Sequence, residues 1–278
     1  MKLAILTCTF KRPELNEIVH KYYADNFENC VLISVGAFND YQNINYLWNN
    51  YTFQNEPIAQ KFNFAFERAK TFNPDAVILI GSADLLSKEL VEYYQKNYSS
   101  DADYVLGLKD LYLYEISTRR TMFWHGFPPA YADQPVGGGR IFSRKLLDKI
   151  NWRPYANMTI NRGLDNNSSI YMKAKGIGMQ TVLMQDSGIA VGLKPFQTLN
   201  KFETWLYNGE LIEINLMQNK FPDYLDAIHK TEPDESKFKG TVMVRFLKDL
   251  EEFRDGTEMA MDGMTALGLV RNKIIELV

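Results

Sequence analysis

The sequence lacks the features that mark several large classes of protein. Two cysteines, Cys8 and Cys30, are too few for a disulfide framework, and both lie in apolar runs, so we expect a reducing compartment. Positive charge is not in excess, because 31 Lys and Arg against 34 Asp and Glu give a net charge of −3. That balance does not indicate a nucleic-acid binder, although a local basic patch remains open. No apolar run approaches the roughly 20 residues of a membrane span, and the apolar start is too short for a signal peptide. We therefore expect a cytoplasmic protein without a membrane span.

The residues that are present predict an ordered α/β protein. Aromatic residues make up 13% of the 278 residues and charged residues only 23%, which excludes general disorder. In the first hundred residues, short apolar runs alternate with segments of helical spacing. We expect strands over 3–8, 30–35 and 76–80, and helices over 13–23 and 58–70. This order is typical of an open, mostly parallel sheet, in which ligands bind at the carboxyl ends of the strands.

The rest of the chain is less regular. Ser87 and Ser143 have the positions of helix caps, for helices over 87–97 and 143–150. Further strands are expected over 104–108, 111–114 and 181–184, and the aromatic stretch 117–135 is expected to be an irregular functional loop. From about residue 201 the chain is acidic, with helical spacing over 241–253 and 259–278. We therefore expect an α/β domain over 1–200 and a helical C-terminal appendage over 201–278.

Charge differs between the thirds of the chain. Residues 101–200 carry 12 basic and 8 acidic side chains, whereas residues 201–278 carry 10 and 15. The basic middle third is suited to an anionic ligand, although ordinary surface variation explains it as well.

The first candidate for chemistry is Asp84, which comes directly after the apolar run 76–80. Mg²⁺ and Mn²⁺ commonly take one or two protein carboxylates and complete their shell with phosphate oxygens and water. A carboxylate at a strand end is therefore well placed to hold a cation against a diphosphate. The alternative is that Asp84 caps the following helix.

Several segments resemble glycosyltransferases of the GT-A fold, especially the large family-2-like group. The start Leu6-Thr7-Cys8-Thr9-Phe10-Lys11-Arg12-Pro13 is similar to the first strand and loop of that family. The remaining similar segments, in the family's order, are 55–63, 75–86 and 137–144 followed by 161–165. The resemblance covers about residues 1–195. It implies a GT-A fold and transfer of a sugar from a nucleotide diphosphate sugar, most simply a UDP-sugar, to a hydroxyl group with inversion.

The resemblance also implies a donor site and a metal. The residues it assigns to the nucleotide sugar are Thr7, Thr9, Arg12, Lys61, Asn63 and Ser82. Asp84 is the implied ligand of Mn²⁺ or Mg²⁺. The family's Asp-x-Asp position reads Ser82-Ala83-Asp84 here, so only its last carboxylate is present. That departure leaves weaker metal binding, or transfer without a metal, as alternatives.

Asp165 is the candidate catalytic base. It is expected in a polar loop before a helix over 169–175, and inverting transfer needs one carboxylate to deprotonate the attacking hydroxyl. The metal and basic side chains would stabilise the leaving diphosphate. The alternative role of Asp165 is to cap the next helix.

The implied acceptor side contains aromatic, glycine and arginine residues. Its members are Trp124, His125, Gly138, Gly139, Arg140 and Arg162. The run Gly137–Gly139 lets the backbone approach a ligand closely, but it lacks the Gly-Lys-Ser/Thr ending of a phosphate loop. Aromatic loops stack on sugars or bases, and they are also common in plain packing.

The overall pattern is most similar to transferases encoded by tailed bacteriophages, some of which glycosylate hydroxymethylated cytosines in DNA. Duplex DNA as the acceptor requires a basic track and an aromatic pocket for a flipped base. The candidates for that track are Arg119, Arg120, Arg140, Arg144, Lys145, Arg153 and Arg162. A surface glycan is the competing acceptor. The competing function is a non-catalytic nucleotide- or glycan-binding module, and a nucleotidyltransferase is disfavoured because no basic glycine-rich loop follows the N-terminus.

Overall fold

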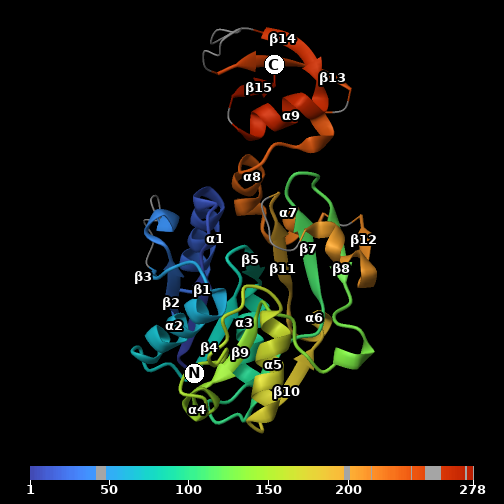
Figure 1. Ribbon diagram of the computed structural model, residues 1–278. Helices are drawn as coiled ribbons and strands as arrows, with labels where there is room; N and C mark the ends of the chain where they lie inside the picture. The colour runs from blue at the N-terminus through green and yellow to red at the C-terminus, as the bar shows by residue number, and fades with distance from the viewer. Residues whose placement is uncertain are drawn as a thin grey trace.

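A seven-stranded sheet forms the centre of the protein (Figure 1). The computed structural model describes residues 1–41, 48–196, 201–213, 215–238, 240–247, 258–272 and 274–277. The strand order is β10-β6-β9-β4-β1-β2-β3. The bounds are β1 Leu3–Cys8, β2 Val31–Gly36, β3 Asn49–Thr52, β4 Ala76–Ile80, β6 Tyr104–Leu108, β9 Arg140–Ser143 and β10 Gly178–Val182. All neighbours are parallel except β9, which runs antiparallel between β4 and β6. The predicted open, mostly parallel sheet is confirmed.

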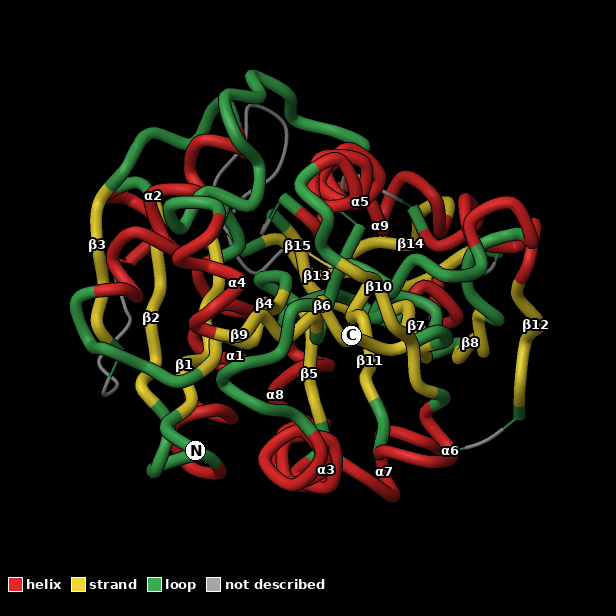
Figure 2. Tube along the Cα trace, turned by 90° about the horizontal axis from the view of Figure 1, so that it is seen from below, coloured by secondary structure: helices red, strands yellow, loops and turns green. Residues whose placement is uncertain are grey.

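Helices cover both faces of this sheet, because alternate residues of its central strands point in opposite directions. Ile5 and Ile78 pack with α1 and α3, whereas Leu6 and Val77 pack with α2, α4 and α5. Figure 2 shows α2, α4 and α5 on one side and α3 on the other. The bounds are α1 Pro13–Asn26, α2 Ile58–Lys70, α3 Lys88–Asn97, α4 Arg144–Lys149 and α5 Leu164–Ala174. No helix within the described ranges is long and apolar enough to cross a membrane.

A second sheet lies against the first and has the order β12-β8-β7-β11-β5. Its bounds are β5 Asp84–Leu86, β7 Leu111–Glu115, β8 Thr121–Trp124, β11 Ala190–Lys194 and β12 Gly209–Ile212. The stretch 117–135 is therefore not wholly irregular: β8 lies within it, and only a short 3-10 turn, Pro129–Tyr131, follows. β8 has only four residues, of the sequence Thr-Met-Phe-Trp, and they do not alternate between polar and apolar, so the sequence pattern does not reveal a strand.

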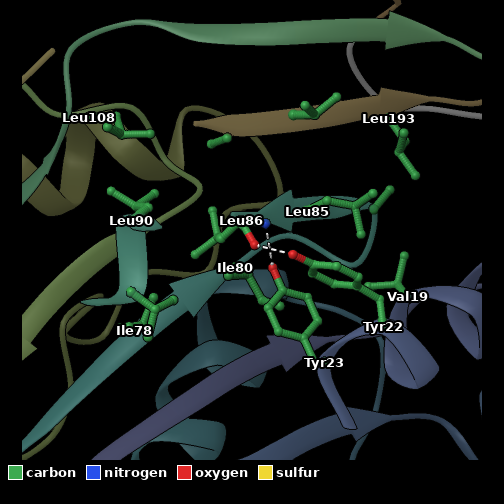
Figure 3. Close-up of a cluster of buried hydrophobic side chains, with 14 of the residues drawn as sticks. Val19, Tyr22, Tyr23, Ile78, Ile80, Leu85, Leu86, Leu90, Leu108 and Leu193 are labelled. Carbon is green, nitrogen blue, oxygen red and sulfur yellow. Dashed lines mark hydrogen bonds between the residues drawn. The ribbon is translucent and has the colours of Figure 1, made fainter. Parts of the chain in front are cut away.

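Helix α1 joins the two sheets through a pair of tyrosines (Figure 3). The Tyr22 hydroxyl donates to the Leu86 carbonyl at 2.6 Å, and the Leu86 N–H donates to the Tyr23 hydroxyl at 3.1 Å. Leu85 and Leu86 of β5 pack in the same buried cluster as Ile78 and Ile80 of β4. The short strand β5 is thereby fixed beside the strand that precedes it in the chain.

The prediction of a helical C-terminal appendage is wrong in its secondary structure. After the 3-10 helix Phe202–Asn208, β12 pairs with β8, and the helices α7 Leu216–Lys220 and α8 Pro222–Lys230 follow. Beyond α8, at the top of Figure 1, a small antiparallel sheet has the order β14-β13-β15 and packs against α9. Its bounds are β13 Thr241–Phe246, β14 Glu258–Asp262, α9 Gly263–Arg271 and β15 Ile275–Leu277.

The physical reason is the two-residue period of this segment. Val242 and Val244 face the small core, whereas Met243 and Arg245 are exposed. Within the predicted helix over 259–278 only α9 is helical, and residues 248–253 of the predicted helix over 241–253 lie outside the described residues.

A histidine is buried where α1 meets the first sheet. His20 is 1% exposed, and its ring stacks on Trp48 with the centroids 4.2 Å apart. Neither ring nitrogen has a hydrogen-bond partner in the described part of the chain. Burial lowers the pKa of His20 to about 3, because no group in the core compensates an imidazolium charge.

His20 should make the fold sensitive to acid. The unfolded chain binds a proton at this histidine below about pH 6.5 and the folded chain does not, so stability falls by up to about 1.4 kcal/mol per pH unit from there towards pH 3. His20→Phe keeps the stacking and removes this loss. Urea unfolding at pH 7, 6, 5 and 4.5 should show that the free energy of unfolding of the variant rises relative to that of the wild type as the pH falls.

The control is His125→Phe, which removes one histidine at an exposed position. Identical pH dependence of the free energy of unfolding in the His20→Phe variant and the wild type would contradict the prediction.

Candidate active site

The turn that leaves β4 carries the chain from the first sheet into the second. Gly81–Ala83 form this turn, and Asp84 is the first residue of β5. The Gly81 N–H donates to Asp84 Oδ2 at 2.8 Å, which fixes the carboxylate at the point where the two sheets diverge. The alternative that Asp84 caps α3 is excluded, because the cap is Ser87, whose Oγ accepts the Leu90 N–H at 3.4 Å.

A second carboxylate lies beside the first, across two consecutive glycines. A Cβ atom on Gly138 would lie 2.2 Å from Asp84 Oδ2, and one on Gly137 would lie 2.4 Å from Asp165 Oδ2. Only glycine permits this approach. Asp165 lies in the first turn of α5 rather than in a preceding loop, and the helix cap is Gly163, so Asp165 is not the cap either. The structure thus brings together the two acidic residues that the sequence singles out.

A lysine that the sequence analysis missed completes the charged group. Lys194 ends β11, and the pairing of Gly192 with Asp84 brings this strand to the two carboxylates. Burial lowers the pKa of Lys194 to about 8, and the Asp84 charge opposes that shift. Burial raises the pKa of Asp84; the Lys194 charge acts against this rise and the Asp165 charge adds to it. Asp84 and Asp165 with Lys194 and Arg12 therefore form a group of formal charge zero.

Asp84, Asp165 and Lys194 line a cavity of about 160 Å³. Trp124 and Trp205 form part of its aromatic wall, with their rings edge to face and the centroids 4.8 Å apart. Phe127 also lines it. An aromatic wall beside carboxylates and an ammonium group suits a small ligand that has both an apolar face and hydroxyl groups.

Part of the predicted donor site assembles beside Asp84. Arg12 Nη2 donates to Ser82 Oγ at 2.9 Å, and burial lowers the Arg12 pKa while the Asp84 charge opposes the shift. Thr7 and Thr9 are buried at the end of β1, and Thr9 Oγ1 donates to the Val35 carbonyl at 3.4 Å. These residues meet because the strands β1 and β4 are parallel neighbours.

Asp40 is a further buried residue that the sequence analysis missed. Its carboxylate accepts the backbone N–H groups of Lys11 at 2.7 Å and Ala37 at 2.8 Å. It thereby ties the loop after β1, in which Lys11 and Arg12 both have positive φ, to the loop after β2. The signal in the sequence that could have identified Asp40 is an acidic residue shortly after the second predicted strand.

Lys61 and Asn63 do not line the cavity; both are buried in α2. The Lys61 ammonium donates to the Thr9 carbonyl and, at 2.6 Å, to Asn55 Oδ1. Asn63 donates to the Ala156 carbonyl and accepts the Tyr155 N–H. The structure therefore gives both side chains a supporting role in place of the expected contact with the nucleotide sugar, because their polar groups are used inside the protein.

The predicted acceptor residues separate into two groups. Trp124 and Gly138 line the cavity. His125, the next residue of β8, is exposed and lies 3.6 Å from Glu210, so it faces away from Trp124. Gly139, with φ of 84°, follows Gly138, and Arg162 is exposed in the loop before α5.

Arg140 was expected to contact the acceptor, but it is 1% exposed. Its guanidinium donates to the carbonyls of Pro135 and Val136 and, at 3.3 Å, to that of Asp165. It therefore connects the loop that leads to Gly137 with the first turn of α5.

The basic track predicted for DNA does not form as a row of free side chains. Arg119 donates to the His229 and Glu232 carbonyls, and Arg120 pairs with Glu115 at 2.6 Å. The other internal contacts are those of Arg140, of Arg144 with Asn73 and Pro74, and of Arg153 with Gln60 and Glu67. Most of the charge that favoured a DNA acceptor is therefore engaged inside the protein.

Replacing Gly138 should disable the site without unfolding the protein. The new Cβ in Gly138→Ala displaces the Asp84 carboxylate, and a displacement of about 1 Å in a group that positions a ligand is expected to lower the activity proposed below roughly 100-fold. Because the displaced atoms are the end of a side chain, stability should stay within about 1 kcal/mol of the wild type. Gly268→Ala, where nothing lies within 4 Å, is the control. Full activity of Gly138→Ala would show that the position of this carboxylate is unimportant.

No protein-family model and no curated protein matches the sequence. Solved structures with a similar arrangement include a mannosyltransferase, PcManGT from Pyrobaculum calidifontis, in complex with GDP-Man and Mn²⁺; the match has 10% identity and a TM-score of 0.49, and covers 83% of this chain and 69% of that one. S. aureus TarS matches at 13% identity and a TM-score of 0.42, over 71% and 36% of the two chains. GalNAc-T7 with UDP, GalNAc and Mn²⁺ matches at 10% identity and a TM-score of 0.47, over 74% and 45%.

Proposed function

We propose that this protein is a glycosyltransferase that transfers a sugar from a nucleotide diphosphate sugar to a hydroxyl group with inversion. The observation that carries the proposal is the pair of carboxylates, Asp84 and Asp165, held against Gly137 and Gly138 at an aromatic cavity. The carboxyl ends of β1 and β4 meet beside this pair, which is where ligands bind in open α/β sheets.

The proposed donor is a UDP-sugar with its diphosphate near Arg12 and Ser82. A guanidinium is a strong hydrogen-bond donor to phosphate oxygens, and Arg12 is already oriented by its bond to Ser82. The transferred sugar then lies towards the cavity and its aromatic wall.

Asp165 is the proposed base. It takes the proton of the acceptor hydroxyl as that oxygen bonds to the anomeric carbon, and the bond from that carbon to the diphosphate oxygen breaks. The leaving diphosphate keeps the electron pair of the broken bond. Attack from the side opposite to the leaving group inverts the anomeric configuration.

The residues fit a divalent cation at Asp84. Burial raises the pKa of Asp84 and the Asp165 charge adds to that rise, so a cation bound there would stabilise the ionised carboxylate. No group of three or more His, Cys, Asp or Glu side chains gathers among the described residues, so phosphate oxygens and water would complete the shell. Mn²⁺ or Mg²⁺ bound there supplies charge stabilisation for the departing diphosphate.

For the acceptor we propose a sugar hydroxyl, as in a glycan. The cavity is of the order of one small ligand, and its wall offers aromatic faces and hydrogen-bonding groups. Hydroxymethylated cytosine in duplex DNA is the competing acceptor, and the engaged arginines disfavour it. Incubation with glycans and with hydroxymethylated DNA, followed by mass spectrometry of the products, separates the two.

Asp165→Asn should lower turnover by about 10²–10⁴-fold with little change in donor affinity, because the base acts only in the transition state. UDP release from a panel of UDP-sugars in the presence of Mn²⁺ measures turnover, and calorimetry measures affinity. Asp101→Asn, at an exposed position, is the control. Retention of configuration in the product, or normal turnover of the variant, would remove Asp165 from this role.

Asp84→Ala should abolish metal-dependent donor binding. The variant removes the acceptor of the Gly81 N–H and part of the charge that compensates Lys194, so urea unfolding must first show that it is folded under the conditions of the titration. Titration of UDP with Mn²⁺, and again with a chelator, tests this with no turnover required. If neither the substitution nor the chelator changes the affinity for UDP, Asp84 holds no metal; if the wild type neither binds UDP nor releases it from any donor, the proposed function is wrong.

A further inference from the structure

Strand register directs Lys194 towards the two carboxylates. In the antiparallel pair of β11 and β5, Gly192 lies opposite Asp84, and a Cβ on Gly192 would lie 3.5 Å from Asp84 Oδ1. Side chains two residues apart in a strand share one face of the sheet. The Lys194 side chain therefore leaves β11 on the same face as the Asp84 carboxylate, and it lines the same cavity.

The lysine is held in the cavity wall without an ion pair. Within the described ranges, no carboxylate oxygen lies within 4.0 Å of the Lys194 ammonium. The ammonium lies 4.8 Å from the centroid of the Trp205 ring, an arrangement that holds a cation without using its hydrogen-bond donors. Lys194 and the two carboxylates, Asp84 and Asp165, all line the cavity.

Arg12 is a second cation near Asp84, and it belongs to the proposed site of the nucleotide sugar. Arg12 and Lys194 both act on the charge of Asp84, and they repel each other. A neutral sugar leaves that repulsion in place, whereas an anion that contacts both cations relieves it. A diphosphate is such an anion, and it is the part of the proposed donor that gains negative charge during transfer.

We propose that Lys194 is a catalytic residue that donates a hydrogen bond to the terminal phosphate of the diphosphate leaving group. This inference rests on the proposed function. As the bond between the anomeric carbon and the phosphate oxygen breaks, its electron pair stays on that oxygen, and the ammonium stabilises the new charge without giving up a proton. The acceptor proton goes to Asp165, so the two residues have separate roles.

The test compares two nucleotides that differ by the terminal phosphate. In Lys194→Met the affinity for UDP, measured by calorimetry, should fall about tenfold or more, whereas the affinity for UMP should stay within about twofold. Lys194→Arg should recover part of the UDP affinity. Turnover of the Met variant should fall more than its KM rises, because the contact strengthens in the transition state.

The matched control is Lys96→Met, which removes an exposed lysine on α3. Equal losses of UDP and UMP affinity, or unchanged UDP affinity in Lys194→Met, would overturn the role of Lys194 while leaving the proposed function standing. A wild-type protein that binds neither nucleotide and releases no UDP would overturn both.

Discussion

Two like charges lie side by side where the two sheets diverge, and the rest of the site compensates for this arrangement. Glycine at 137 and 138 gives the carboxylates of Asp84 and Asp165 their space, and the backbone N–H of Gly81 fixes one of them. Lys194 and Arg12 balance their charge. Apolar residues at these positions would make the fold more stable. The charged group therefore lowers the stability of the fold, which is typical of a functional site.

Buried polar side chains hold the loops around this group. Arg140 connects the loop before Gly137 to the backbone of Asp165, Lys61 supports the loop after β1, and Asp40 joins that loop to the one after β2. These contacts go largely to backbone groups. They allow loops that carry few apolar side chains to keep one conformation, which a site of defined geometry needs.

The sequence predicts β1, β2, β4 and β6 well because these strands are mostly apolar runs, and it predicts α3 and α4 because a serine caps each of them. Ser87 and Ser143 cap the helices as expected. The structure also places Asp84 and Asp165, which the sequence singles out separately, against the adjacent Gly138 and Gly137. It does not predict which polar residues turn inwards: Lys61 and Arg140 have the residue types of ligand contacts, but they donate mainly to backbone carbonyls of loops, which the sequence pattern does not locate. Lys194 is missed for a related reason, because only the pairing of β11 with β5 brings it to the site.

The pairing of β12 with β8 has a consequence for the order in which the protein is made. The last strand of the central sheet ends at Val182, whereas the strand that bears Trp124 gains its outer neighbour only with Gly209–Ile212. At roughly 5–20 residues per second, the ribosome delivers those residues about 2–6 s after the central sheet is complete. The strands of the central sheet are therefore all synthesised before the aromatic wall of the cavity can close.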